Sequence, residues 1–238
     1  MIKYTACSLA LQVRIEAEGV CFSGLTIKSV GQQASVVEIL SGSLAMKGCR
    51  VEGGSSQAVK VARSTQESSA GSLSARSSVF VSKGDGLSVL DSNAVLEEQC
   101  SFSACGKNGV YVAGEGAVVS AQDSTVEQNG WSNVAVDEGA QVSLLHVQSM
   151  NSSKGGHGWD VGAKGSCLLA KHSSASHNGG CGALVTDGAS LLATNCLLAG
   201  NRQDGALAQG GSSMLLVESQ CRDSSRYGWF ASNNSCCT

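Results

Sequence analysis

A short motif recurs along the chain at intervals of 23 to 25 residues, and this periodicity limits the possible folds more than any other feature. Each copy consists of an apolar residue, a variable residue and a second apolar residue, which is the period-two pattern of a strand with one buried face. The clearest copies are Val110–Val112, Val134–Val136, Trp159–Val161, Ala183–Val185, Ala206–Ala208 and Trp229–Ala231. Three earlier copies are Val37–Ile39, Val59–Val61 and Leu87–Val89. The longer step between the last two indicates an inserted Ser-rich loop around residues 65–72.

Two further apolar triplets follow each copy, separated by turns rich in Gly, Asn, Asp and Ser. The second triplets include Val119–Ala121, Val142–Leu144, Leu168–Ala170, Leu191–Ala193 and Met214–Leu216. The third, weaker ones include Ser124–Val126, Val147–Ser149, Ser173–Ala175, Cys196–Leu198 and Ser219–Cys221. Three such strands per turn can bury their apolar sides only if successive turns stack on one another. A β-sandwich would need hairpins instead, and a leucine-rich repeat would need a different consensus.

The pattern therefore predicts an all-β fold, a single-stranded right-handed parallel β-helix (solenoid) of about ten coils of roughly 23 residues, with three short strands per coil. The right hand is expected because parallel crossover connections strongly favour it. We expect one β-helix domain over residues 1–238, with clear repeats at 19–231, an N-terminal leading coil at 1–18 and a C-terminal tail at 232–238. The absence of proline suits strands that are paired on both edges.

Runs such as Gly116–Gly130 give the chain a resemblance to a known group of proteins. The sequence resembles the right-handed parallel β-helix repeat proteins of the pectate-lyase-like superfamily. Within that superfamily, the repeats of this chain most resemble the simple repeats of copper-accessory periplasmic proteins and of some F-box proteins. The resemblance extends over residues 19–231 and implies the fold. It leaves the activity open, because this fold carries lyases, hydrolases, epimerases and binding modules.

Composition and charge exclude several classes of partner. The net charge is −3 and no basic stripe is interleaved with aromatic residues, so we expect no nucleic-acid partner. No apolar run approaches about 18 residues, so we expect no membrane span.

The N-terminal sequence lacks the pattern of a signal peptide, which predicts a cytoplasmic location. The 11 cysteines include no Cys-x-x-Cys pair and are interpreted as buried, reduced thiols. We expect no cofactor.

A few polar residues are candidates for carbohydrate binding or catalysis. Gly156-His157-Gly158 is similar to the Gly-His-Gly element of polygalacturonases, but the chain lacks the adjacent carboxylates that such inverting hydrolases use. On the outward side of the first strand, Asp160 and nearby Asp137 could share a site, although two carboxylates are too few for a calcium cage. The candidate carbohydrate contacts are Tyr111, Asp137, Asp160 and His157. The alternative for His157 is a turn residue without such a role.

A second set of polar residues falls four positions after apolar residues that we expect to pair in the second strands, namely Leu96, Val119, Val142, Leu168, Leu191 and Met214. This set is Cys100, Asp123, His146, His172, Asn195 and Glu218. If the register holds, these residues line up at one corner of the solenoid, with the two histidines on adjacent coils. His146 and His172, flanked by Asp123 and Asn195, could then hold Zn²⁺ or Cu²⁺. The alternative is a solvated polar ladder.

Apolar residues at outward positions of the C-terminal half predict an interaction surface. Leu184, Leu207 and Phe230 form one column of the first strands, and Leu169, Leu192 and Leu215 form one of the second strands. Aligned apolar residues on neighbouring coils make contiguous patches, which usually mark interfaces. Trp159 and Trp229 are expected in the core or at its rim, and Trp131 could be exposed.

We therefore expect a non-catalytic binding or scaffold module that presents a rigid surface to a protein or glycan partner. The expected partner is a protein, or a second copy of the chain, at the C-terminal half, and a polysaccharide is also possible. One alternative is a carbohydrate-active enzyme of the lyase, hydrolase or epimerase type. Another is a fragment or subunit of a larger assembly.

Overall fold

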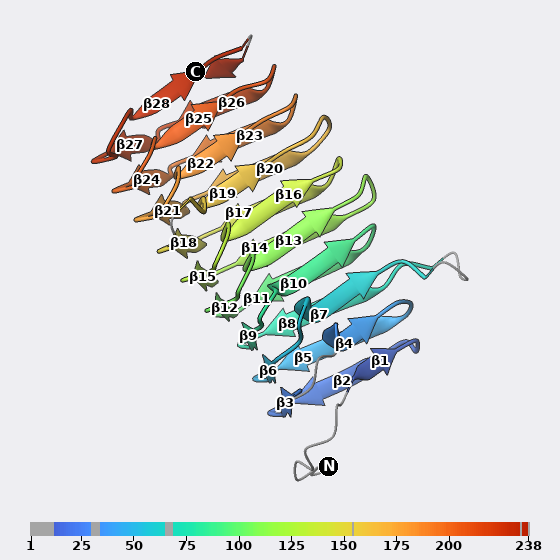
Figure 1. Ribbon diagram of the computed structural model, residues 1–238. Coiled ribbons are helices and arrows are strands. Elements are labelled where there is room, and N and C mark those ends of the chain that lie inside the picture. The colour runs from blue at the N-terminus through green and yellow to red at the C-terminus, as the bar shows by residue number, and fades with distance from the viewer. Residues whose placement is uncertain (1–11, 30–33, 65–68, 154, 234, 238) are drawn as a thin grey trace.

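The computed structural model describes residues 12–29, 34–64, 69–153, 155–233 and 235–237, and over these residues the chain winds into a parallel β-solenoid (Figure 1). Three parallel sheets run along it, and each described coil except the last contributes one strand to each sheet. Residues 1–11 of the predicted leading coil lie outside the described residues. So do residues 65–68 of the predicted loop and residues 234 and 238 of the predicted tail.

The strands alternate strictly between the three sheets, which we call A, B and C. Sheet A consists of β1 (Val13–Ile15), β4 (Ser35–Ile39), β7 (Gln57–Ala62), β10 (Asp85–Leu90), β13 (Val110–Ala113), β16 (Val134–Asp137), β19 (Trp159–Val161), β22 (Ala183–Val185), β25 (Ala206–Ala208) and β28 (Trp229–Ala231). Sheet B consists of β2 (Val20–Ser23), β5 (Ser43–Lys47), β8 (Ser72–Arg76), β11 (Asn93–Glu97), β14 (Val118–Gln122), β17 (Gln141–Leu145), β20 (Cys167–Lys171), β23 (Ser190–Thr194), β26 (Ser213–Val217) and β29 (Cys236–Cys237). Sheet C consists of β3 (Thr26–Lys28), β6 (Arg50–Glu52), β9 (Val79–Val81), β12 (Ser101–Ser103), β15 (Thr125–Glu127), β18 (Gln148–Met150), β21 (Ser174–Ser176), β24 (Leu197–Ala199) and β27 (Gln220–Arg222).

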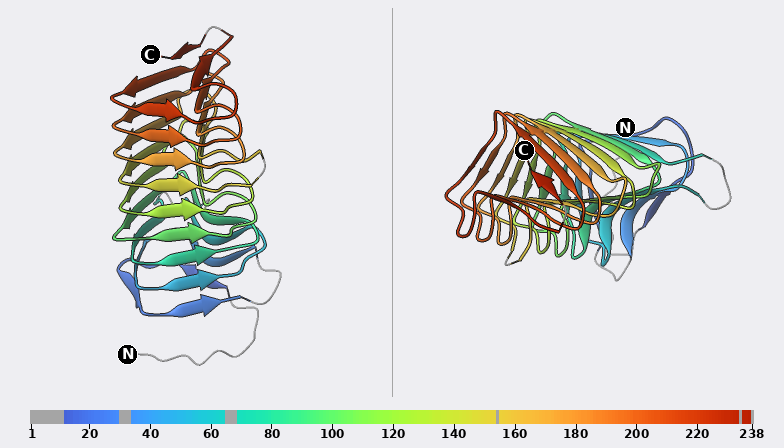
Figure 2. Two further views of the ribbon diagram at one scale, coloured as in Figure 1. Left: turned by 90° about the vertical axis from the view of Figure 1, so that its left-hand side faces the viewer. Right: turned by 90° about the horizontal axis from the view of Figure 1, so that it is seen from above.

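The predicted fold class is confirmed, and the strand register is as predicted except at Leu96, which pairs with Ala121 and not with Val119. In sheet A, Val110 pairs with Val134 and Val134 with Trp159, so each apolar triplet lies on the next one. In sheet B, Leu168 pairs with Leu191 in the same way. The described residues contain no helix, and therefore none that is long and apolar enough to cross a membrane. Figure 2 shows the stacked coils from two further directions.

The core is a column of small and medium aliphatic side chains that runs through the solenoid. Phe80 and Phe102 stack on adjacent coils with ring centroids 4.7 Å apart. Trp159 is fully buried, and its Nε1 donates a hydrogen bond to Ser149 Oγ at 3.1 Å, which confirms its predicted place in the core. Successive coils approach closely before sheet A: a Cβ on Gly182 would lie 2.5 Å from the carbonyl oxygen of Gly205, so no other residue fits there.

The corner between sheets B and C is made by a residue with left-handed backbone in nearly every coil. His146 has φ 53° and His172 has φ 50°, and Asp123 and Asn195 occupy the same corner position in their coils. One coil differs, because both Glu98 and Gln99 have positive φ there. The prediction that Cys100 belongs to this corner column is wrong, because Leu96 pairs with Ala121 and not with Val119, which places Glu98 opposite Asp123. Cys100 is buried in the core.

The corner between sheets C and A contains a ladder of buried asparagine side chains. Asn129 Nδ2 donates to Asn133 Oδ1 at 2.9 Å, and Asn133 Nδ2 donates to Asn178 Oδ1 at 3.0 Å. Asn178 Nδ2 donates in turn to Asn201 Oδ1 at 3.1 Å. Asn133 thus reaches across the coil in which Ser152 occupies the corner. The ladder binds consecutive coils together and satisfies amides that would otherwise be buried without partners.

Between sheets A and B, the insertion predicted between Val59 and Leu87 is present. Its base is closed by an antiparallel bridge between Arg63 and Ala70.

Candidate functional site

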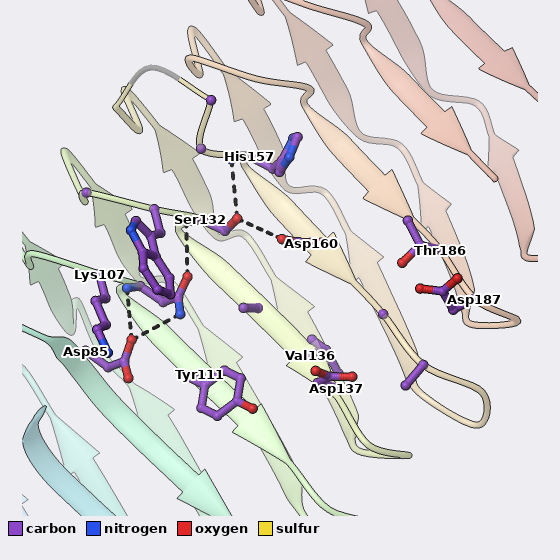
Figure 3. Close-up of a pocket in the computed structure, with 18 residues that line it drawn as sticks. Asp85, Lys107, Tyr111, Ser132, Val136, Asp137, His157, Asp160, Thr186 and Asp187 are labelled. Carbon is purple, nitrogen blue, oxygen red and sulfur yellow. Dashed lines mark hydrogen bonds between the residues drawn. The ribbon is translucent and has the colours of Figure 1, made fainter. Parts of the chain in front are cut away.

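An open groove of about 900 Å³ crosses the outer surface of sheet A in the middle of the solenoid (Figure 3). Its walls come from Asp85 at the start of β10, from the turns before β13, β16 and β19, from outward side chains of those three strands, and from the turns after β19 and β22. Five successive coils contribute residues, so the groove extends for on the order of 20 Å along the solenoid. The polar and aromatic side chains that line it include Asp85, Lys107, Asn108, Tyr111, Trp131, Ser132, Asp137, His157, Asp160, Thr186 and Asp187.

One edge of the groove is organised by a ladder of side-chain acceptors, one per coil, in the turn just before sheet A. Asp85 Oδ1 accepts the backbone N–H of Asn108 at 3.0 Å, and Asn108 Oδ1 accepts that of Ser132 at 3.1 Å. Ser132 Oγ accepts the backbone N–H of His157 at 3.4 Å, and His157 Nδ1 accepts that of Cys181 at 2.9 Å. Each of these four side chains is therefore held in place by the coil above it.

The ladder also determines the state of His157. Because Nδ1 accepts a backbone N–H, the ring is neutral and carries its proton on Nε2. Burial lowers the pKa of His157, and the nearby charge of Asp160 opposes this shift. Burial raises the pKa of Asp160, while His157 and a hydrogen bond from Ser132 Oγ at 3.1 Å act in the opposite direction. The groove therefore places a neutral imidazole near a carboxyl that keeps its proton to a higher pH than an ordinary Asp.

Two aromatic side chains lie along the groove. Trp131, in the turn before β16, is 57% exposed, and Lys107 Nζ lies 5.2 Å from the centroid of its ring. Tyr111 points outward from β13 and is half-buried. Burial raises the pKa of Tyr111, and the neighbouring charge of Asp137 raises it further. The groove thus combines a solvated indole with a partly covered phenol.

The charge of the groove is predominantly acidic. Its lining contains the carboxyl groups of Asp85, Asp137, Asp160 and Asp187, and Lys107 is the single lysine or arginine among the described lining residues. Burial raises the pKa of Asp85, although hydrogen bonds from the backbone and side chain of Asn108 oppose the shift. A ligand of this groove therefore meets more carboxyl than ammonium groups.

The four predicted carbohydrate contacts, Tyr111, Asp137, Asp160 and His157, all line this one groove. Lys107, Asp85 and Asp187 were not predicted as site residues, and Trp131 was not predicted to lie with the others. A signal was present, because a polar residue precedes the Gly or Asn that leads into several first triplets, as in Asn108-Gly109, Ser132-Asn133 and His157-Gly158.

The predicted metal residues lie at the corner between sheets B and C, away from the groove lining. His146 Nδ1 lies 3.2 Å from Asp123 Oδ1, and the ring centroids of His146 and His172 are 5.4 Å apart. Asn195 has the equivalent corner position on the following coil. Over the part of the chain that the structure describes, no three His, Cys, Asp or Glu side chains form a metal-binding cluster.

The predicted interaction residues fall into two groups. In sheet B, Leu169 pairs with Leu192 and Leu192 with Leu215, and the three side chains are 47%, 37% and 43% exposed. In sheet A, Phe230 is exposed, but Leu184 and Leu207 are half-buried. The sheet B leucines, which we call the leucine column, are therefore the more accessible group.

Trp131 and Trp229 both lie on the surface. Trp131 is exposed, as we expected it could be. Trp229, on the last strand of sheet A, is also 57% exposed and lies at the rim of the core.

Comparison with models of protein families, with curated proteins and with solved structures finds no match to this chain. Its function is therefore inferred from the site alone.

Proposed function

We propose that this chain is a non-catalytic β-solenoid module that binds a glycan in the groove on sheet A. The observation that supports this most is that exposed Trp131 shares a groove with several hydrogen-bonding side chains on consecutive coils. Sugar rings present an apolar face and a polar edge, so they suit an indole surface bordered by carboxyl, hydroxyl and imidazole groups. The acceptor ladder holds Ser132 and His157 in fixed positions, which reduces the entropy lost on binding.

The charge of the groove favours one class of glycan. Four Asp side chains against Lys107 would repel a polyuronate chain, because like charges across an interface are unfavourable. The hydroxyl groups of a neutral glycan can donate hydrogen bonds to those carboxylates. An amino sugar would add an attractive ammonium group. We therefore propose a neutral or amino-sugar oligosaccharide as the ligand.

Trp131→Ala tests this proposal, with Trp229→Ala as a matched control because both side chains are 57% exposed. Calorimetry would use three probes of equal length: a neutral β-linked glucan, a deacetylated chito-oligosaccharide and an oligogalacturonate. We expect the wild type to bind at least one of the first two. Trp131→Ala should weaken that binding about tenfold, or ~1.4 kcal/mol, and Trp229→Ala should leave it unchanged. Preferential binding of the oligogalacturonate, or equal effects of both substitutions, would contradict the proposal.

A carbohydrate-active enzyme is the second candidate, and Asp160 is the observation that favours it. A carboxyl whose pKa is raised by burial can serve as a general acid, and Asp137 lines the same groove. Release of new reducing or unsaturated ends from the bound glycan, lost in Asp160→Asn, would support catalysis. Unchanged glycan after prolonged incubation with the wild type would support the binding module.

We also propose that the leucine column binds a protein partner. Three in-register exposed leucines form an apolar stripe on sheet B, and such stripes usually mark interfaces. A second copy of the chain is the proposed occupant.

We also propose a cytosolic location, because reduced thiols are typical of that compartment. The cysteines that carry free thiols include Cys21, Cys49, Cys100, Cys105, Cys167, Cys181 and Cys196.

A further inference from the structure

Two histidine side chains lie next to each other on a rigid corner of the solenoid. His146 and His172 occupy the same position between sheets B and C on adjacent coils. The backbone N–H of His146 donates to Lys171 O at 3.1 Å, and that of His172 donates to Thr194 O at 3.0 Å. The ring centroids are 5.4 Å apart, and the ring planes are tilted by 35°. Hydrogen bonding between coils therefore continues through the corner and holds the two imidazoles in register.

Asp123 orients the first of these rings. Its Oδ1 lies 3.2 Å from His146 Nδ1, and Gln122 Nε2 donates to its Oδ2 at 3.0 Å. An ionised carboxylate can only accept, so Nδ1 of His146 carries the proton and Nε2 presents a lone pair. A histidine that donates one ring N–H to a carboxylate while its other nitrogen is a ligand is a recurrent arrangement in metal sites.

The separation of the two rings matches one coordination geometry. With a nitrogen–zinc bond of about 2.0–2.1 Å, the centroid of a bound imidazole lies about 3.2 Å from the metal. Two imidazoles at a tetrahedral angle then have centroids about 5.2 Å apart, and at a right angle about 4.5 Å apart. The observed 5.4 Å is close to the tetrahedral value. A square-planar ion such as Cu²⁺ would require the rings to move closer together to bind in cis, or farther apart, to about 6.4 Å, to bind in trans.

We propose that His146 and His172 bind one Zn²⁺ ion, with Asp123 orienting His146 and water completing a tetrahedral shell. The site has two protein ligands. It is therefore not one of the clusters of three or more ligand side chains, which the described residues do not form. Both histidines and Asp123 are exposed, so the ion exchanges freely with solvent. The site is separate from the groove and does not depend on the proposed glycan function.

The chain has four histidines, which permits a closely matched test. His172→Asn removes one ligand, and Asn is compatible with the left-handed corner because Asn195 already occupies the equivalent position. His177→Asn is the control, since His177 is also exposed and has φ 57°. Zinc chloride would be titrated by calorimetry near neutral pH. Exposed thiols such as Cys21 would be alkylated in every sample, because thiolates also bind zinc.

We expect one Zn²⁺ per chain for the wild type and for His177→Asn, and no stoichiometric binding for His172→Asn. Asp123→Asn should weaken binding roughly tenfold, as for other partners that orient a ligand. In ¹⁵N-detected imidazole spectra, zinc should shift Nε2 of His146. If His172→Asn does not fold, His146→Asn serves in its place. Absence of zinc binding by the wild type, or equal binding by His172→Asn and His177→Asn, would overturn the proposal.

Discussion

At the scale of single residues, His157 shows how a backbone contact determines side-chain chemistry. Its Nδ1 accepts the N–H of Cys181, and protonating that nitrogen would replace an acceptor with a donor pointed at a donor. Burial also lowers the pKa of His157, since the charged ring is poorly solvated. The stabilisation from neutral His157 is therefore present above its unfolded pKa of about 6.5 and is lost as the pH falls toward the lower folded value.

We predict that acid destabilises the wild type more than His157→Asn between pH 7 and pH 5.5. Asn keeps an acceptor for the Cys181 N–H, as Asn108 does for Ser132, but has no proton to gain. The difference should not exceed about 1.4 kcal/mol per pH unit, and urea unfolding at several pH values measures it. The raised pKa of Asp160 acts in the opposite sense, because its stabilisation is lost as the pH rises through the folded value.

His177→Asn is the control for this prediction, because His177 is exposed. Equal pH dependence of the wild type and His157→Asn would contradict the role given to His157.

At the scale of elements, the corners between sheets hold side-chain hydrogen bonds that are as well defined as the pairing of the strands. Asn178 is fully buried, and its side chain contacts three neighbouring coils. Its Oδ1 accepts from Asn133 Nδ2 at 3.0 Å and from the Ser152 N–H at 3.2 Å, and its Nδ2 donates to Asn201 Oδ1 at 3.1 Å. Removing this amide leaves several buried donors and acceptors without partners, which costs more than losing the bonds alone.

Asn178→Ala should lower the free energy of unfolding by roughly 3 kcal/mol, because at least two buried polar groups lose their partners. The control is Asn93→Ala on β11, where the side chain is exposed. That change should alter the free energy of unfolding by less than about 0.5 kcal/mol. Chemical denaturation of both variants measures the difference, and similar losses would refute the importance of the ladder.

The strands were more predictable than the corners, and the reason is physical. In sheets A and B, two inward residues flank an outward one, so alternation alone predicts the register of Val110 with Val134. A corner has no such period. Cys100 was predicted in the wrong column because Leu96 pairs with Ala121 and not with Val119, so counting four residues from Leu96 ends two residues beyond the corner at Glu98. The groove was predicted in part for the same reason: Tyr111 and Asp160 lie on strands, whereas Trp131 and Lys107 lie in turns.

At the scale of the whole molecule, the outer faces of sheets A and B differ in character. The groove on sheet A is polar and acidic, whereas the leucine column on sheet B is apolar. Toward the N-terminus, the leucine column continues into Ser143 and Ser120, which are also exposed. On the coil before Ser120 the column is apolar again, because Val95 pairs with Ser120 and is 41% exposed. Ser120 and Ser143 are therefore polar positions in the same column as the leucines.

If the leucine column mediates self-association, Leu169→Glu with Leu192→Glu should convert the protein to a monomer while leaving its β-sheet circular dichroism intact. The matched control is Ser120→Glu with Ser143→Glu, on the same column of sheet B. That pair adds the same charge without removing apolar surface. Sedimentation velocity over a wide concentration range measures the result. A wild type that remains monomeric at the highest concentration would exclude this interface.

Pairing between neighbouring coils also governs how the chain reaches its native state. Each strand of sheet A meets its partner after roughly one coil, as Val110 does with Val134, so most loops that close during folding are short. Once two coils have stacked, each additional coil closes a similar short loop and pairs with strands that have already formed. Folding then propagates coil by coil along the axis. Unfolding should follow the same path in reverse, with coils separating in succession from one end. A repeat of this kind can also lengthen during evolution by duplicating one coil, since the strands of a new coil pair with those of the coils directly above and below it.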